Sequence, residues 1–457
     1  MKSPFRIAAV VAVTGVVTLH ADVPTATDVT FAQAANSRTV TITYKLSSAP
    51  AVTTLDIQTN AGNNVWVSIG DANISHLTGD INRLVSGKET YTMKWHPDLS
   101  WPDHKVAPNG ARAVITAWAP DNTPDYMVVD LTGSLADPVR YYPSAEAVPG
   151  GVLSNTAYRT TALLMRKIMA KDVRWTMGSV GEPGRASNET AHSVQLTNNY
   201  YIGVFPITQT QWQIAGRARP TPSAFNLAGY GMMRPVDNVC YNEIRTGNSQ
   251  NYVSGFDWPQ PPATGSYLGW LRLISRGTSF PAGVDFDLPS EAEWEFAARA
   301  GHGEGYWGNG KPILSNNRDD NLPGRYSWNG GTLDGGSSGS SLPTPSACTD
   351  ATGTPIVGTN GCNDWGLYDM NGSIFEVCLD WYEANITSET IFNGKVNVDP
   401  NNAAKTLSGA TGSNRVAKGG AWRYSADICR NAYRYQLNPG SSSNLGGLRV
   451  VCRAGLK

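Results

Sequence analysis

Charge is scarce in this chain, and neither sign dominates. Asp, Glu, Lys and Arg make up 16% of the 457 residues, and the formal net charge is -1 at pH 7. Without an excess of positive charge there is no electrostatic reason to expect nucleic acid or an anionic membrane as a partner. Long apolar runs are also missing after the N-terminus, so no later segment is expected to span a membrane.

The first 21 residues have the pattern of a signal peptide. Lys2 and Arg6 form a charged start, and the apolar run over 7–17 has the length of a signal-peptide core, with cleavage expected near Ala21. The alternative is a membrane anchor, but the run is too short for a hydrocarbon layer of ~30 Å. We therefore expect an exported protein that is secreted, periplasmic or held at the cell surface.

Cysteine is absent from the first 239 residues, and the six that follow are far apart: Cys240, Cys348, Cys362, Cys378, Cys429 and Cys452. No two of them have the C-x2-4-C spacing of a structural zinc site. An even number of cysteines in an exported chain favours disulfides. Cys348 and Cys362 flank one polar loop and form a plausible local pair, whereas the pairing of the other four stays open.

Common catalytic signatures are missing as well. The chain has no G-x-S-x-G, no P-loop and no H-E-x-x-H. Its six histidines do not cluster with the cysteines. Asp and Glu are scattered along the chain, which leaves a carboxylate pair open but marks none.

The residues before 135 differ in pattern from those that follow. Alternating apolar and polar residues predict strands over 38–46, 64–70, 111–119 and 125–133. Short strands with turns between them are typical of an antiparallel sandwich. We expect an immunoglobulin-like β-sandwich over 27–135, closed by the strand at 125–133 and serving as a spacer or docking module. The alternative is one larger domain.

A linker rich in Pro, Gly and Ser is expected over 136–156, followed by a mixed domain over 157–457. One helix of that domain is clear in "FDLPSEAEWEFAARAG" (286–301), where Ser290 and Glu293 form a capping box. We assign its glutamates to capping and solvation rather than catalysis. A second amphipathic helix is expected near 262–276, and a flexible loop over 329–342.

Seven phrases of this second domain occur in a characteristic order: "WTMGS" (175–179), "YYIGVFPITQTQW" (200–212), "RPVDNVCYNE" (234–243), "DLPSEAEWEFAARAG" (287–301), "DWGLYDMNGSIFEVCLDWY" (364–382), "RVAKGGAWR" (415–423) and "NLGGLRV" (444–450). Together they resemble the formylglycine-generating enzyme, or sulfatase-modifying factor, family. The resemblance implies an α+β fold class, with an irregular C-type-lectin-like domain after the all-β sandwich. That family holds copper oxidases, iron enzymes and members that only bind, so the fold does not settle the function.

The copper oxidases of the family turn a substrate cysteine into formylglycine. They use two cysteines spaced C-x4-C, because soft thiolates select copper(I). Alignment on the "GGAW" turn at 419–422 puts Cys429 at the second position and Tyr424 at the first. The H-x3-H-x-E ligands of the iron enzymes are also missing. We therefore lean against an enzyme, with Cys429 as the one weak catalytic candidate; the alternative is a formylglycine-generating oxidase with an altered copper site.

The phrase "LYDMNGSIFE" (367–376) wraps a structural calcium ion in the family. The resemblance implies that the side chains of Asp369 and Glu376 and the carbonyls of Gly372 and Ile374 are the ligands, and oxygen is what this hard cation prefers. The alternative is a turn followed by a strand, with Asp369 capping backbone amides. A second calcium site would fall within 309–326.

The C-terminal segment alternates two kinds of position. One set matches the framework of non-catalytic relatives: Trp422, Ala426, Cys429, Arg430, Ala432, Arg434, Pro439, Gly446 and Arg449. The other set lies between them: Arg423, Tyr424, Ser425, Asp427, Ile428, Tyr433, Tyr435, Gln436 and Leu437. In some lectin-fold proteins a diversity-generating retroelement varies such positions, which then bind ligand.

We expect these intervening positions to bind a protein or a carbohydrate, because tyrosine gives contact area at low entropic cost. An ordinary polar surface and a purely structural surface component are the alternatives. Cys429 is expected to be a framework cysteine in a disulfide, with Cys378 as its candidate partner.

Overall fold

The computed structural model describes residues 23–107, 109–216, 223, 232–247, 260–276, 285–315, 318–327, 353–384, 397–398 and 414–453. The expected signal peptide, the loop over 329–342 and Cys348 lie outside these residues. Across the described ranges, no helix combines the length and the apolar character needed to cross a membrane.

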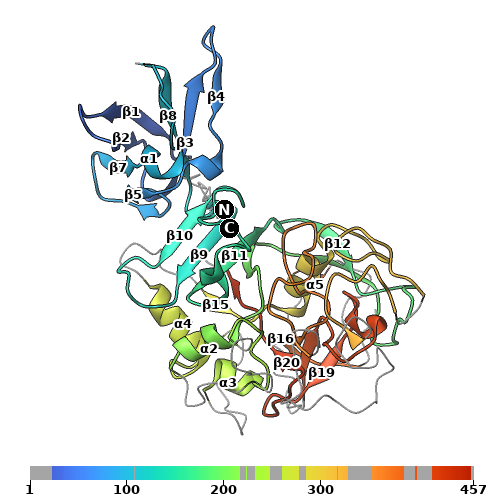
Figure 1. The fold of residues 1–457 in the computed structure, drawn as a ribbon. Coiled ribbons are helices and arrows are strands. Elements are labelled where there is room, and N and C mark those ends of the chain that lie inside the picture. Colours follow the sequence, from blue (N-terminus) through green and yellow to red (C-terminus); the bar gives the residue numbers. More distant parts are fainter. Residues whose placement is uncertain are drawn as a thin grey trace, which may run out of the picture.

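Two antiparallel sheets form the N-terminal part (Figure 1). The first has the order β1-β2-β7-β5, with β1 (Ala26–Gln33), β2 (Val40–Leu46), β7 (Tyr91–Trp95) and β5 (Leu77–Gly79). The second is centred on β3 (Ala51–Asn60), which pairs with β4 (Trp66–Ser68), β6 (Leu84–Val85) and β8 (Ala111–Trp118). Ile42 and Met93 of the first sheet share one buried cluster with Ile57 of the second. The sheets therefore form a sandwich, and its immunoglobulin type stays a prediction.

The strand expected to close this sandwich belongs to another sheet. β9 (Tyr126–Asp130) pairs with β10 (Val139–Tyr142) and with β11 (Ala162–Ile168). They belong to a six-stranded sheet of order β10-β9-β11-β14-β21-β15, completed by β14 (Tyr200–Gly203), β21 (Val451–Cys452) and β15 (Phe286–Asp287). The segment expected to be a linker thus contains a paired strand. Alternation in the sequence marks a strand but does not say which sheet it joins.

Among the described residues, two smaller sheets and four α-helices complete the second part. One sheet has the order β12-β13-β17, with β12 (Arg174–Met177), β13 (His192–Gln195) and β17 (Asn397–Val398). The other has the order β19-β18-β16-β20, with β19 (Tyr435–Leu437), β18 (Arg415–Lys418), β16 (Phe375–Trp381) and β20 (Gly446–Gly447). The helices are α2 (Gln209–Ile214), α3 (Tyr241–Arg245), α4 (Tyr267–Ser275) and α5 (Glu291–Arg299). The result is sheet-rich with few helices.

Helix α5 begins where the sequence predicts. The Ser290 hydroxyl accepts the backbone N–H of Glu293, whose carboxylate accepts the backbone N–H of Ser290. The expectation that its glutamates are solvated is wrong, because Glu291, Glu293 and Glu295 are all buried. Each forms an ion pair with a basic side chain from a distant segment, which local periodicity does not reveal.

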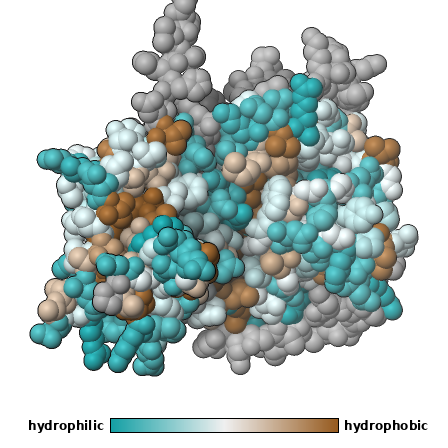
Figure 2. Space-filling view, turned by 90° about the horizontal axis from the view of Figure 1, so that it is seen from above, coloured by the Kyte–Doolittle hydropathy of each residue, from teal (hydrophilic) through white to brown (hydrophobic). Residues whose placement is uncertain are grey.

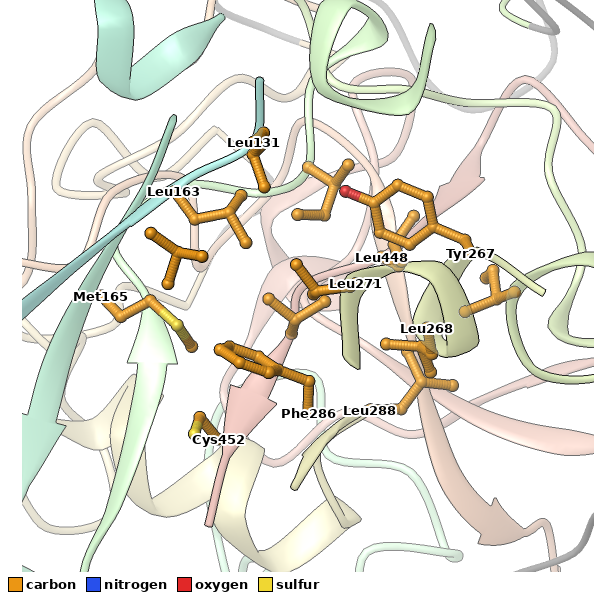
Figure 3. Packing of buried hydrophobic residues seen from close by; sticks show 14 of the residues in the cluster. Leu131, Leu163, Met165, Tyr267, Leu268, Leu271, Phe286, Leu288, Leu448 and Cys452 are labelled. Carbon is orange, nitrogen blue, oxygen red and sulfur yellow. The ribbon is translucent and has the colours of Figure 1, made fainter. Parts of the chain in front are cut away.

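Helix α4 packs on the six-stranded sheet, and its apolar side contributes to the largest core. Figure 3 shows Leu268 and Leu271 of α4 together with Met165 of β11, Phe286 of β15 and Cys452 of β21. Strands from the beginning and the end of the second part's sequence thus share one core, which holds the last strand, β21, in place.

The sandwich contacts the second part through apolar and polar residues, since Val52 of β3 shares a buried cluster with Met127 of β9. Arg83 binds Asp80 in the sandwich and Asp137 next to β10, at 2.8 and 2.7 Å. In Figure 1, β19 and β20 lie at the end of the second part away from the sandwich. From above, apolar side chains are spread among hydrophilic ones, without one large apolar patch on that face (Figure 2).

Candidate ligand-binding face

The C-terminal segment folds as a turn, a short 3₁₀ helix and an edge strand. Gly419 and Gly420 make the turn after β18, both with positive φ. A Cβ on Gly420 would lie 2.5 Å from the Cys429 sulfur, so only glycine fits above that thiol. The helix η6 (Ala426–Cys429) follows, and β19 then pairs with β18.

Burial separates the two sets of C-terminal positions completely. The nine framework residues are all buried: Trp422, Ala426, Cys429, Arg430, Ala432, Arg434, Pro439, Gly446 and Arg449. The nine intervening residues are all partly or fully exposed: Arg423, Tyr424, Ser425, Asp427, Ile428, Tyr433, Tyr435, Gln436 and Leu437. We call this second set the C-terminal face.

Aromatic rings form the centre of the C-terminal face. Tyr435 stacks on the buried ring of Phe375, with centroids 4.3 Å apart and an interplanar angle of 13°. Tyr424 meets the same ring edge-on at 5.5 Å. Burial and the neighbouring Tyr435 hydroxyl raise the pKa of Tyr424 to about 12, so this phenol is neutral at physiological pH. The two tyrosines are therefore held in fixed positions before any ligand arrives.

Arg430 joins the C-terminal face to a distant loop. Its guanidinium binds the carboxylates of Glu182 at 3.0 Å and Glu189 at 2.7 Å. It also donates to the carbonyls of Gly184 and Asp427, at 2.8 and 2.9 Å. Arg430 and both glutamates are buried, so these charges compensate one another inside the protein rather than meeting solvent.

Two further framework arginines act in the same way. Arg434 binds both carboxylate oxygens of Glu291, at 2.6 and 2.9 Å. Arg449 binds Glu376 at 2.8 Å and donates to the carbonyls of Gly203 and Tyr368. Their role is to support the surface, since their donors are taken up by the protein itself.

Cys429 is a free thiol, and so is Cys378, so the expected disulfide between them is wrong. Cys429 packs with Trp307 and Tyr326, whereas Cys378 belongs to a separate buried cluster. Each sulfur fills apolar space in its own cluster. Cys362 is a free thiol too, and its candidate partner Cys348 is outside the described residues.

The residues at the family's copper position do not fit a two-thiolate site. Tyr424 occupies the first position and packs on Phe375. Cys429 at the second position is buried, and burial raises the pKa of its thiol. A buried, protonated thiol and a phenol are not the soft ligand pair that copper(I) selects.

The expected calcium ligands do not all fit a cation. The Glu376 carboxylate binds the Arg449 guanidinium and the Trp294 indole N–H, at 2.7 Å from the latter. Asp369 fits better, since one of its oxygens accepts the Gly358 N–H while its buried Oδ1 has no hydrogen-bond partner in the described structure. Within the described ranges no three His, Cys, Asp or Glu residues cluster as metal ligands do.

The loop that carries the expected carbonyl ligands is closely packed. Gly372 has φ of +78°, and a Cβ there would lie 2.1 Å from the Arg325 carbonyl. The backbone of Ile374 is buried beside it. In the region of the expected second calcium site, the buried Asp319 carboxylate accepts N–H groups of Trp307, Leu314 and Asn321.

A cavity of about 460 Å³ opens beside the C-terminal face. Asp427 and Ala426 form one wall, and the loops at 181–184 and 313–315 form the others. Sequence reasoning did not link these two loops to Asp427, because both are far from the C-terminal segment in the chain; 313–315 was considered only as part of the second calcium region at 309–326. Only the fold brings them to Asp427.

Comparisons with known proteins agree on the family of the second part. A family model described as "Sulfatase-modifying factor enzyme 1-like domain" matches residues 148–454. The chaperone protein LppX of Paenibacillus barcinonensis is 24% identical over 56% of this chain and 80% of its own length. The formylglycine-generating enzyme of Thermomonospora curvata is 30% identical over 44% of this chain and 62% of its own length.

A catalytically inactive relative is also similar. The inactive C-alpha-formylglycine-generating enzyme 2 of Bos taurus is 24% identical over 50% of this chain and 74% of its own length. Among solved structures, Treponema denticola variable protein 1 aligns with a TM-score of 0.44 and 23% identity, over 64% of this chain and 96% of that one.

Proposed function

The chain belongs to the family of sulfatase-modifying factor enzyme 1-like domains, and we propose that it is an exported binding member of that family, not an oxidase. The C-terminal face binds the ligand, which is a protein or a carbohydrate. One observation carries this proposal: all nine intervening residues reach the surface while all nine framework residues are buried. Such a separation lets the residues that reach the surface serve recognition while the buried framework holds the fold.

The C-terminal face has the composition and the support that recognition needs. Tyr424, Tyr433 and Tyr435 supply large rings with few rotatable bonds, and Ser425 and Gln436 supply adaptable hydrogen bonds. The buried framework arginines hold the segment to distant loops, so little entropy is lost when a ligand binds.

Diversification by a retroelement would act on this arrangement. Substitutions at the nine partly or fully exposed positions would change what is recognised, while the buried framework stays constant. A diversified origin predicts a reverse transcriptase gene nearby and a near-repeat of the gene's 3′ end that differs at adenines. Their absence would end the claim of diversification and leave ligand binding standing.

The oxidase remains the alternative, and the residues at the copper position argue against it. Tyr424 lacks the soft sulfur that copper(I) needs, and the Cys429 thiol is buried. The names of the similar proteins do not decide the question, since they include an enzyme, an inactive relative and a chaperone.

Binding is tested with a glycan array and a surface-displayed library of small protein domains, both probed with the full chain. We expect selected ligands to lose at least about tenfold in affinity, or about 1.4 kcal/mol, on Tyr435→Ala or Gln436→Ala. Leu99→Ala, at a side chain that is 59% exposed on the sandwich, is the matched control. Ligands that bind all variants equally would refute the proposal. Conversion of a cysteine-containing sulfatase peptide with copper and oxygen would establish the oxidase instead.

A further inference from the structure

The cavity beside the C-terminal face has a chemical character of its own. Its apolar wall is formed by Pro183, Ile313, Leu314 and Ala426. Among the described residues that line it, Asp427 is the only one with a charged side chain. The cavity therefore combines an apolar surface with one negative charge.

The negative charge of Asp427 is not neutralised by the residues described around it. Its carboxylate accepts a hydrogen bond from the Ser425 hydroxyl. No ion pair joins it to a Lys or Arg side chain in the described ranges. Arg430 binds Asp427 through the backbone carbonyl and not through the carboxylate. The positive charge of Arg430 is compensated by Glu182 and Glu189.

The walls of the cavity are fixed before a ligand binds. Gly184 has φ of +74°, and a Cβ there would lie 2.5 Å from the Asp427 Cβ, so the loop packs directly against this residue. In the wall formed by 313–315, the Leu314 N–H is bound by Asp319 at 2.7 Å. The Glu304 carboxylate accepts the N–H groups of Val180 and Gly181 and so holds the other end of the 181–184 loop.

We propose that this cavity binds a lysine or arginine side chain of a protein ligand. The methylene stem lies against Leu314 and Pro183, and the ammonium or guanidinium group pairs with the Asp427 carboxylate. The proposal rests on the proposed function, because Asp427 belongs to the C-terminal face. It makes that function more specific, since a neutral sugar lacks the cation and an acidic sugar is repelled by the carboxylate.

Small probes test the cavity without knowledge of the whole ligand. Nα-acetyl-arginine amide and Nα-acetyl-lysine amide are titrated against the full chain by calorimetry, with Nα-acetyl-norleucine amide as the uncharged analogue. We expect the two cationic probes to bind and the norleucine probe to bind at least about tenfold more weakly. Equal binding of the three would overturn the proposal, because the carboxylate would then play no part.

Two variants locate the binding. Asp427→Asn is expected to weaken the arginine probe by about tenfold or more, whereas Asp121→Asn, at an exposed carboxylate between β8 and β9, is not. Near-ultraviolet circular dichroism checks that each variant is folded. Leu314→Ala changes a side chain that is 39% exposed, so it keeps the fold, and it should weaken the arginine probe through loss of the stem contact.

The outcomes separate this inference from the proposed function. If the arginine probe binds Asp427→Asn or Leu314→Ala as well as the unaltered chain, the cavity proposal fails and binding through Tyr435 and Gln436 is unaffected. If the library ligands are insensitive to Tyr435→Ala while the arginine probe still requires Asp427, the proposed face fails and the cavity stands.

Discussion

Replacing Arg430 by methionine removes the guanidinium that joins the C-terminal face to the loop over 182–189. Methionine keeps much of the apolar volume of the side chain but none of its donors. Four groups lose a partner: the carboxylates of Glu182 and Glu189 and the carbonyls of Gly184 and Asp427. Arg430, Glu182 and Glu189 are buried, so water does not replace the two ion pairs, whereas the carbonyls of Gly184 and Asp427 lie at the cavity.

Glu189 is affected most by this change. Glu182 keeps Arg299 at 3.7 Å, but the only ion pair found for Glu189 in the described structure is with Arg430. Breaking a buried ion pair by removing one partner costs about 3–5 kcal/mol, because the other charge is left uncompensated. We therefore expect Arg430→Met to lower the free energy of unfolding of the second part by about that amount.

Urea unfolding followed by tryptophan fluorescence measures the loss, and a double-mutant cycle assigns it. Glu189→Gln removes the stranded charge, so Arg430→Met should cost less in the Glu189→Gln background, with a coupling energy of about 1–3 kcal/mol. A loss below about 1 kcal/mol for Arg430→Met, or no coupling in the cycle, would refute the reasoning.

Two further outcomes are expected. If a calcium ion binds near Asp369, chelation lowers the melting temperature of the chain and Asp369→Ala abolishes that shift; a melting temperature unchanged by chelation would count against calcium. Burial alone would raise the pKa of Glu295, but Lys418 and Arg299 lower it to about 2 from the ordinary 4.5. The ionised Glu295 carboxylate stabilises the fold fully above pH 4.5, and this stabilisation is lost as the pH falls toward 2. The melting temperature should therefore fall over this pH range, and it should fall less steeply in Glu295→Gln. An equal pH dependence in both proteins would contradict this.

Several features were readable from the sequence because they depend on neighbours along the chain. The capping box at Ser290 and Glu293 predicts the start of α5, and the structure confirms it. The ordered phrases predict the family, which the match over 148–454 confirms. The resemblance to non-catalytic relatives divided the last segment into framework and intervening positions, and the structure buries the framework positions.

Other features were decided by tertiary structure, because they join residues far apart in the chain. The strand at Tyr126–Asp130 was visible in the sequence, but its partner strands were not. An even number of cysteines favoured disulfides, yet the clusters around Cys378 and Cys429 hold these two thiols apart. Asp427 was one of nine intervening positions in the sequence, and only the folded loops at 181–184 and 313–315 turn it into the charged wall of a cavity. Local patterns mark helix starts and strands, whereas burial of charged residues, partners and cavities depend on packing that a short window of sequence does not contain.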